Sequence, residues 1–315
     1  MDDSLIHAVA GGAGGMVAMA LTYPLIFLST RAAVDKNKDQ KSVKQAVLEV
    51  LKNEGITGLY SGLSSSLLGI AVTNFVYYGF YEKSKSVVLR SRPGKGLTTL
   101  ESILVGMIAG SATSIISNPI WVIQTTQAVR TMETNPSTSS EPATSDSSVS
   151  PQKPRKLGFI ECINHIIEND GIAAFWRGIG PALALVINPV IQYTVFEQLK
   201  NRLLARRTAR LRAAGSASAA VLTSLDLFFL GSLSKLVATG STYPYIVIKS
   251  RMQAGHAMAK EYKSALGGIL KVTREEGIPG LYKGIESKLL QSVLTAAILF
   301  VSQQRIYELT KAVSC

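Results

Sequence analysis

The sequence predicts an all-α membrane protein in which apolar segments are arranged as three tandem repeats of about 100 residues. The first observation behind this prediction is an eight-residue element that occurs at residues 55–62, 171–178 and 277–284. Each copy follows an acidic residue, begins and ends with Gly, and has an aromatic residue two positions before its last Gly. We call these three segments the octets. Because they recur in register, they indicate an internal threefold repeat.

The second observation is the composition of the chain. Of its 315 residues, 47% are hydrophobic and only 17% are charged, and the mean hydropathy is +0.23. An ordinary soluble protein carries more charge than this. The apolar segments also contain small and polar residues, as do membrane spans that pack closely or line a cavity. A soluble protein of buried helices is the alternative, and the repeated apolar segments favour the membrane protein.

The first repeat is assigned to residues 1–92. An apolar segment of about residues 6–30 contains Pro24 and is followed by an amphipathic stretch that ends near Leu51. The first octet comes next. A second apolar segment covers about residues 63–81. The order of apolar segment, proline, amphipathic helix, octet and apolar segment defines the repeat.

The second repeat is assigned to residues 93–212 and follows the same order. Its apolar segments cover about residues 100–126, which include Pro119, and residues 181–196. A Ser-, Thr- and Pro-rich insertion at residues 131–156 has almost no apolar content, so we expect it to be disordered. An amphipathic stretch follows it. The basic connector at residues 202–212 is interpreted as a lipid-facing loop, with a targeting element as the alternative.

The third repeat is assigned to residues 213–315, with Pro244 in its first apolar segment. Proline inside a helix removes a hydrogen bond and bends the helix. Since Pro24, Pro119 and Pro244 occupy matching places, the three odd-numbered helices should bend alike. Three equal bends around one axis predict a conical bundle that is closed at one end. The centre of such a bundle is a water-filled cavity, where polar residues at membrane depth are tolerated.

With these elements the chain resembles the mitochondrial carrier family over essentially its whole length. Odd-numbered helices of that family carry Pro-x-acidic-x-x-basic-x-basic, the octet element follows, and even-numbered helices end in aromatic-acidic-x-x-basic. Here Tyr81-Glu82 and Phe196-Glu197 begin two such endings. The resemblance implies six transmembrane helices in a pseudo-threefold bundle, with three short amphipathic helices on one side. It also implies transport by alternating access around one central site, as a monomer.

The chain departs from the family pattern after each proline. At the positions of the acid and the first base it has Ile26 and Ser29, Trp121 and Gln124, and Ile246 and Lys249, so no acid is present and only Lys249 is basic. The ring of three ion pairs that closes the octet side in the family therefore cannot form. Each such pair contributes about 1 kcal/mol when half exposed, so we expect weaker closure on this side. Arg31 and Arg251 do match the last basic position of the pattern.

On the opposite, cytosolic side the family forms a second set of pairs between helices. Glu82 with Lys85 and Glu197 with Lys200 match that pattern in the first two repeats. The third repeat has Ser302, Gln303 and Ile306 instead. We therefore expect two inter-helix pairs on this side, with Gln303 at the third position.

Lys235 is the clearest candidate for binding a substrate. It lies between Leu233 and Leu236, nine residues before Pro244, and ionisable residues at membrane depth are usually functional. The alternative is a lysine that extends to the membrane surface. As a compact cation it suits a phosphate, and Lys288 is a second candidate for that role.

The family's contact points lie on the even-numbered helices, about seven residues after the last Gly of each octet. Counted in this way, they are Gly69, Ile70, Ala184, Leu185 and Gln291. Gly69 is expected to leave room for a flat ring. Further residues that could line the cavity are Asn74, Tyr77, Asn188, Gln192 and Tyr193. Trp121 fits either packing or ring stacking.

Other function classes find little support in the sequence. The net charge of +12 is compatible with nucleic-acid binding, but the cations cluster beside apolar segments, which favours anionic lipids or an anionic solute. Two cysteines and three scattered histidines predict neither a disulfide framework nor a metal site. No phosphate-binding loop or catalytic constellation occurs. We therefore expect a carrier without cofactor, for which a nucleotide would be cargo.

Within the family, the segments around Tyr23, Asn118 and Tyr243 are most similar to those of peroxisomal members that carry adenine nucleotides, NAD or coenzyme A. The predicted function is exchange of ATP for AMP or ADP across the peroxisomal membrane. The alternatives are an NAD or coenzyme A exchanger and a carrier of another anion in the mitochondrial inner membrane. A membrane scaffold that does not transport is the alternative from another class.

Overall fold

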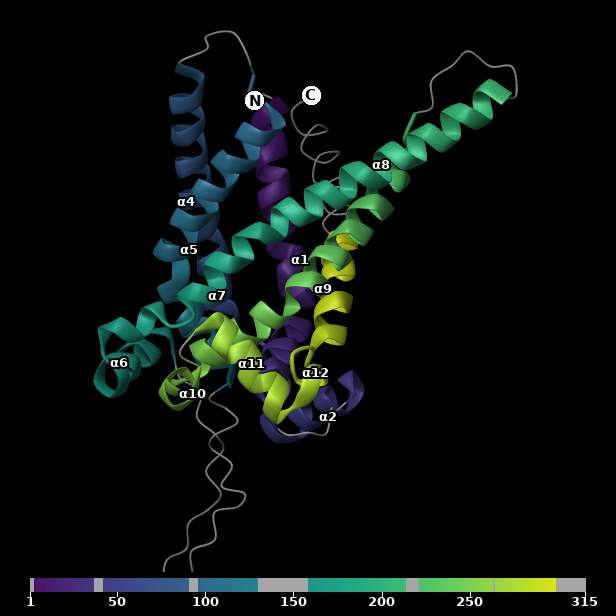
Figure 1. Ribbon diagram of the computed structural model, residues 1–315. Helices are drawn as coiled ribbons and strands as arrows, with labels where there is room; N and C mark the ends of the chain where they lie inside the picture. Colours follow the sequence, from purple (N-terminus) through teal and green to yellow (C-terminus); the bar gives the residue numbers. More distant parts are fainter. Residues whose placement is uncertain are drawn as a thin grey trace, which may run out of the picture. The chain divides into compact units, whose positions relative to one another are not determined.

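The computed structural model describes residues 3–36, 42–90, 96–129, 158–213, 221–262 and 264–298, with side chains from residue 15 onward except at 256–258. Every regular element in these ranges is a helix (Figure 1). The all-α class predicted from the sequence is therefore confirmed for the described part of the chain. The predicted disordered insertion and Gln303 lie outside the described residues.

The chain divides into two compact units. The first unit contains Met1–Thr22, Ala184–Tyr243 and Lys288–Cys315, and the second contains Tyr23–Leu183 and Pro244–Ser287. Helices α1 (Asp3–Val34) and α9 (Ser224–Ala254) contribute to both units. In each of these helices the division falls next to the proline.

Long helices account for the predicted apolar segments. Besides α1 and α9 they are α4 (Leu63–Arg90), α5 (Thr99–Val129), α8 (Asn188–Ala213) and a helix over residues 285–298. Pro24, Pro119 and Pro244 lie inside α1, α5 and α9 without ending them. By length and composition, four segments of the described chain are suited to cross a membrane: Gly15–Val34, Ile56–Arg90, Thr99–Val129 and Ile172–Ala213.

The three predicted amphipathic stretches are short helices, namely α2 (Val43–Glu54), α6 (Phe159–Asp170) and α11 (Ala265–Glu275). Ser42 and Ser264 cap the first turns of α2 and α11 by accepting a backbone N–H bond. Each octet begins with a further short helical segment: α3 (Ile56–Leu59), η2 (Ile172–Trp176) and α12 (Gly277–Gly280). An additional helix, α10 (His256–Glu261), was not predicted from the sequence.

The fourth apolar segment is not one continuous helix. It consists of α7 (Ile179–Ala184), the 3₁₀ turn η3 (Leu185–Ile187) and α8. Pro189 has no N–H with which to bond the carbonyl of Leu185, and the N–H of Asn188 bonds that carbonyl instead. The tighter turn thus follows from the Asn-Pro sequence, and it lies at the predicted contact point.

In the second unit, apolar clusters attach the short helices to the long ones. Val122 and Ile123 of α5 pack with Cys162 and Ile166 of α6, and with Phe175 of the second octet. A corresponding cluster joins α9, α11 and the third octet through Ile248, Tyr262, Val272 and Leu281. These clusters hold the second octet against α5 and the third octet against α9. The residues that follow the prolines are thereby held in place.

Candidate functional site

Lys235 lies in the first unit with its ammonium group directed toward α8. Its Nζ is 3.4 Å from Oδ1 of Asn188, and Nδ2 of Asn188 donates to Oγ1 of Thr242 at 2.7 Å. Lys235 and Thr242 are seven residues apart, so they lie on the same face of α9. The Asn188 amide therefore joins the two helices and leaves its oxygen facing the cation.

The predicted contact residue Gln291 belongs to the same unit and makes a different set of contacts. Its Nε2 donates to Oγ1 of Thr295 at 2.9 Å, and Thr295 Oγ1 is 2.9 Å from Oγ1 of Thr22 on α1. Thr22 and Thr242 occupy the same position, two residues before a proline. Each contacts a polar residue of an even-numbered helix, Thr295 for Thr22 and Asn188 for Thr242. Hydrogen bonds of this kind are common between membrane spans.

A cavity of about 250 Å³ adjoins Lys235 in the first unit. Its walls come from α8, α9 and the helix over residues 285–298. The lining residues are Gln192, Leu227, Phe228, Gly231, Ser232, Lys235, Leu236, Ser292, Val293 and Ala296. Of the further residues that the sequence suggested for a cavity, Gln192 lines this one. Tyr193 is 46% exposed and Tyr77 stacks on Tyr81, with ring centroids 5.8 Å apart.

The room expected beside Gly69 is filled by the protein's own indole. A Cβ placed on Gly69 would lie 3.4 Å from Cζ2 of Trp121, which is ordinary packing contact. Nε1 of Trp121 also donates to Oγ1 of Thr73 at 3.3 Å. Trp121 therefore packs and hydrogen-bonds between α5 and α4 in this conformation. Substrate contact by Gly69, Ile70, Ala184, Leu185 and Gln291 remains a prediction.

The octet side of the second unit is closed by a ring of hydrogen bonds that the sequence argument missed. The residue seven positions after each proline donates to a backbone carbonyl of the next repeat. Arg31 Nε bonds Ala128 O at 3.0 Å, Thr126 Oγ1 bonds Gln253 O at 3.3 Å, and Arg251 Nε bonds Ala33 O at 2.9 Å. Each acceptor lies nine residues after its own proline. The links run from the first repeat to the second, from the second to the third and from the third back to the first, so they form a closed ring.

An apolar cluster and the charges of the octets reinforce this ring. Val34, Val129 and Ala254, each one residue beyond an acceptor, form a buried cluster. The acid that precedes each octet is paired with a cation of its own repeat. These buried pairs are Glu54 with Arg31 at 2.6 Å, Asp170 with Arg177, and Glu276 with both Arg251 and Lys283.

The cation in each pair depends on where the repeat has a basic residue: seven positions after the proline, or next to the last Gly of the octet. The first octet has Ser61 at its basic position, and there Arg31 of α1 neutralises the acid. The second repeat has Thr126 at the position of Arg31, and there the octet residue Arg177 pairs with the acid, Asp170. The third repeat keeps both cations. Because a buried carboxylate without a cation is costly, this substitution pattern explains how the three repeats differ and yet close alike.

The last Gly of each octet makes close approach to the next repeat possible. Gly62, Gly178 and Gly284 have φ of +84°, +74° and +79°. A Cβ on them would lie 3.3 Å from Gln124 O, 3.2 Å from Lys249 O and 2.7 Å from Ser29 O. Each of these carbonyls belongs to the residue five positions after a proline. Both the backbone conformation and the contact therefore require Gly.

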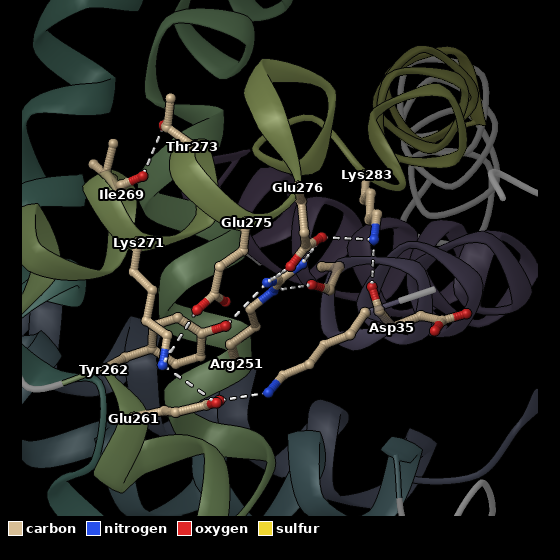
Figure 2. A network of polar contacts seen from close by, with 12 residues as sticks. Asp35, Arg251, Glu261, Tyr262, Ile269, Lys271, Thr273, Glu275, Glu276 and Lys283 are labelled. Atoms are coloured by element: carbon tan, nitrogen blue, oxygen red, sulfur yellow. Dashed lines mark hydrogen bonds and ion pairs between the residues drawn. The ribbon is translucent and has the colours of Figure 1, made fainter. Parts of the chain in front are cut away.

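The junction between the third and first repeats carries additional charged contacts (Figure 2). Lys283 Nζ donates to Asp35 O at 2.9 Å, and Lys36 bonds Glu261 at 2.5 Å. The hydrogen bond from Lys36 lowers the pKa of Glu261, and the same bond raises the pKa of Lys36. Glu261 also lies 3.3 Å from Lys271. Ion pairs thus add to the ring's hydrogen bond at this junction.

The charged residues expected to pair between helices on the cytosolic side make local pairs in the structure. Glu82 pairs with Lys85 and Glu197 with Lys200, in each case three residues apart on one helix and at 3.2 Å. Pairs between these helices stay a prediction, because Glu82 and Glu197 belong to different units. Residues at i and i+3 of a helix are neighbours, so the same spacing that serves an inter-helix network also allows a local pair.

The described chain thus has four segments suited to cross a membrane, as a multi-pass membrane protein requires. The mitochondrial carrier protein family model matches residues 2–92, 95–207 and 220–313. The chain belongs to this family, whose members are transporters. The prediction from the sequence is confirmed on this point.

Several relatives are peroxisomal proteins. The peroxisomal nicotinamide adenine dinucleotide carrier of Arabidopsis thaliana is 35% identical, over 97% of this chain and 96% of the relative. Peroxisomal membrane protein PMP47B of Candida boidinii is 32% identical, over 99% and 88%. Peroxisomal membrane protein PMP34 of Mus musculus is 32% identical, over 96% and 92%. These relatives agree with the predicted location in the peroxisomal membrane.

Proposed function

We propose that this protein exchanges adenine-nucleotide anions across the peroxisomal membrane, with ATP entering and AMP or ADP leaving. The observation that carries the proposal is the position of Lys235. It is a half-buried cation in an apolar helix, and its Nζ lies 3.4 Å from the neutral amide oxygen of Asn188. Among the described residues no carboxylate pairs with Lys235, so the cation is available for an anionic group.

The mechanism follows from the ring on the octet side. Transport by alternating access requires this side of the second unit to open, and the three links of the ring must then break. Breaking neutral and charge-assisted hydrogen bonds costs about 1–3 kcal/mol each, and this cost is offset where a bound anion stabilises the alternative state. Lys235 binds the phosphate in this scheme, and Asn188 holds the lysine in position.

Lys235→Ala and Lys235→Arg in proteoliposomes test the role of the cation. The alanine variant should lose saturable uptake of labelled ATP while inserting as the wild type does, and the arginine variant should retain part of it because it keeps the charge. Full uptake by the alanine variant would remove Lys235 from the site. Thermal unfolding in detergent serves as the control for folding.

Exchange of NAD or coenzyme A is the second candidate. The relative that is 35% identical is named a nicotinamide adenine dinucleotide carrier, and NAD, coenzyme A and ATP all contain a phosphorylated adenosine. Uptake of labelled ATP with NAD, coenzyme A or AMP inside the liposomes separates the two candidates. A preference for internal NAD or coenzyme A over AMP would favour this second candidate.

A further inference from the structure

The cavity beside Lys235 has walls that are unsuited to a phosphate. Three helices contribute to it, and most of the lining side chains are apolar: Leu227, Phe228, Leu236, Val293 and Ala296. A phosphate surrounded by such residues would lose its hydration without compensation. A flat heteroaromatic ring, in contrast, is apolar on its faces and polar only at its edge. The cavity therefore matches a ring better than an anion.

Polar groups occur at a few points of this cavity, as in sites that orient a ligand. Ser232, Gln192 and Ser292 each contribute to the lining. Within the described part of the chain, Oγ of Ser232 is buried and has no hydrogen-bond partner. A buried hydroxyl in this state costs free energy, and a ring nitrogen or an exocyclic amine in the cavity would satisfy it.

The geometry of α9 connects this cavity to the lysine. Phe228, Ser232 and Lys235 are spaced by four and three residues, so they lie along one face of the helix. Lys235 lines the cavity, and its Nζ extends toward Asn188. At about 250 Å³, the cavity is smaller than the pockets of roughly 300–1,000 Å³ that enclose a whole small-molecule ligand. It has room for one part of a larger molecule.

We propose that this cavity receives the nucleobase of the transported nucleotide, with its phosphate on Lys235. The proposal rests on the proposed function, because it assumes that a nucleotide is the substrate. It assigns the faces of the base to the apolar walls, and the polar edge of the base to Ser232 and Gln192. Contacts with the base then distinguish nucleotides from simple phosphate esters, which Lys235 alone cannot do.

Gly231→Leu tests the assignment by filling the cavity. Gly231 lines the cavity, and a Cβ added there meets no atom within 4 Å. Gly240→Leu is the matched control, because Gly240 lies in the same helix, is equally open and is not part of the lining. Both substitutions remove a glycine from a helix interior, so their effects on helix propensity should be alike.

The measurement is stabilisation of the purified proteins against heat by AMP and by ribose 5-phosphate, which lacks the base. The wild type and Gly240→Leu should bind AMP at roughly tenfold or more lower concentration than ribose 5-phosphate, as expected for one buried base. Gly231→Leu should lose this difference while its response to ribose 5-phosphate stays unchanged. Ser232→Val should reduce the difference, and it takes the place of Gly231→Leu if that variant does not fold.

The possible failures are distinguishable. If the wild type is stabilised by no nucleotide and exchanges none, the proposed function is wrong. If the wild type responds and Gly231→Leu keeps its preference for AMP, the base does not occupy the cavity. Equal weakening of AMP and ribose 5-phosphate would also overturn the assignment, since the cavity would then hold the ribose or the phosphate. A cavity filled by a lipid chain predicts an unchanged preference and therefore falls under the second outcome.

Discussion

Replacing Gly284 by Ala should destabilise the protein more than replacing Gly171 by Ala, although both positions have positive φ, at +79° and +77°. The left-handed conformation costs an alanine about 1–2 kcal/mol, and this cost is common to the two variants. At Gly171 the new Cβ meets nothing within 4 Å. At Gly284 it would lie 2.7 Å from Ser29 O and 3.0 Å from Ala32 Cβ.

The contact at Gly284 involves the backbone of α1, so rotation of a side chain cannot relieve it. Overpacking of this kind costs about 1–3 kcal/mol, which corresponds to roughly 1.5–4.5 °C in melting temperature at an unfolding entropy of about 2.1 cal/mol/K per residue. The fluorescence of the tryptophans during heating in detergent measures the difference between the two variants. Equal melting temperatures would refute the close approach between the third octet and α1.

Three further predictions concern the octet side. Thr126→Val removes one link of the ring, the bond to Gln253 O, and should lower the stability by about 1 kcal/mol. It should also increase the labelling, from the octet side, of a cysteine introduced at Val129. Unchanged labelling would contradict the ring. Arg31→Gln leaves Glu54, whose side chain is only 6% exposed, without its cation and should destabilise the protein by about 3–5 kcal/mol. Adding Glu54→Gln to that variant should restore part of the stability, and a further loss would argue against a buried ion pair.

The sequence was sufficient to predict the repeated elements, because each depends on local chemistry. The octets, the prolines and the amphipathic stretches have fixed spacings, and α2, α6 and α11 lie where the periodicity placed them to within a few residues. The break at η3 could also have been expected, since Pro189 has no N–H to continue the helix.

The hydrogen-bond ring was not predictable in the same way. Its acceptors are backbone carbonyls, which every residue has, and so Ala33 and Ala128 give no signal in the sequence. A signal did exist on the donor side, because Arg31, Thr126 and Arg251 share the position seven residues after a proline. Thr126 was overlooked since it is not basic. Weaker closure stays a prediction from the missing ion pairs, and the structure shows the hydrogen bonds that these donors make on the octet side.

Side-chain partners were the least predictable feature of the candidate site. The indole that fills the space beside Gly69 comes from Trp121, on a different helix. The cytosolic pairs have a spacing that fits both a local and an inter-helix contact, and the local one is present. Lys235 was identified because a charge in an apolar segment is conspicuous. Its neighbour Asn188 was suggested as a residue of the cavity, but its hydrogen bond to Thr242 required the structure.

The central claim, that this chain is a nucleotide exchanger, is tested most directly by counter-exchange in proteoliposomes. Liposomes that contain the purified protein are loaded with AMP, ADP, NAD or coenzyme A, and entry of labelled ATP is followed. We predict saturable entry that requires an internal nucleotide and is absent from liposomes without protein. Entry no faster than in protein-free liposomes, for every internal nucleotide and with a correctly folded protein, would contradict the account and favour a membrane scaffold.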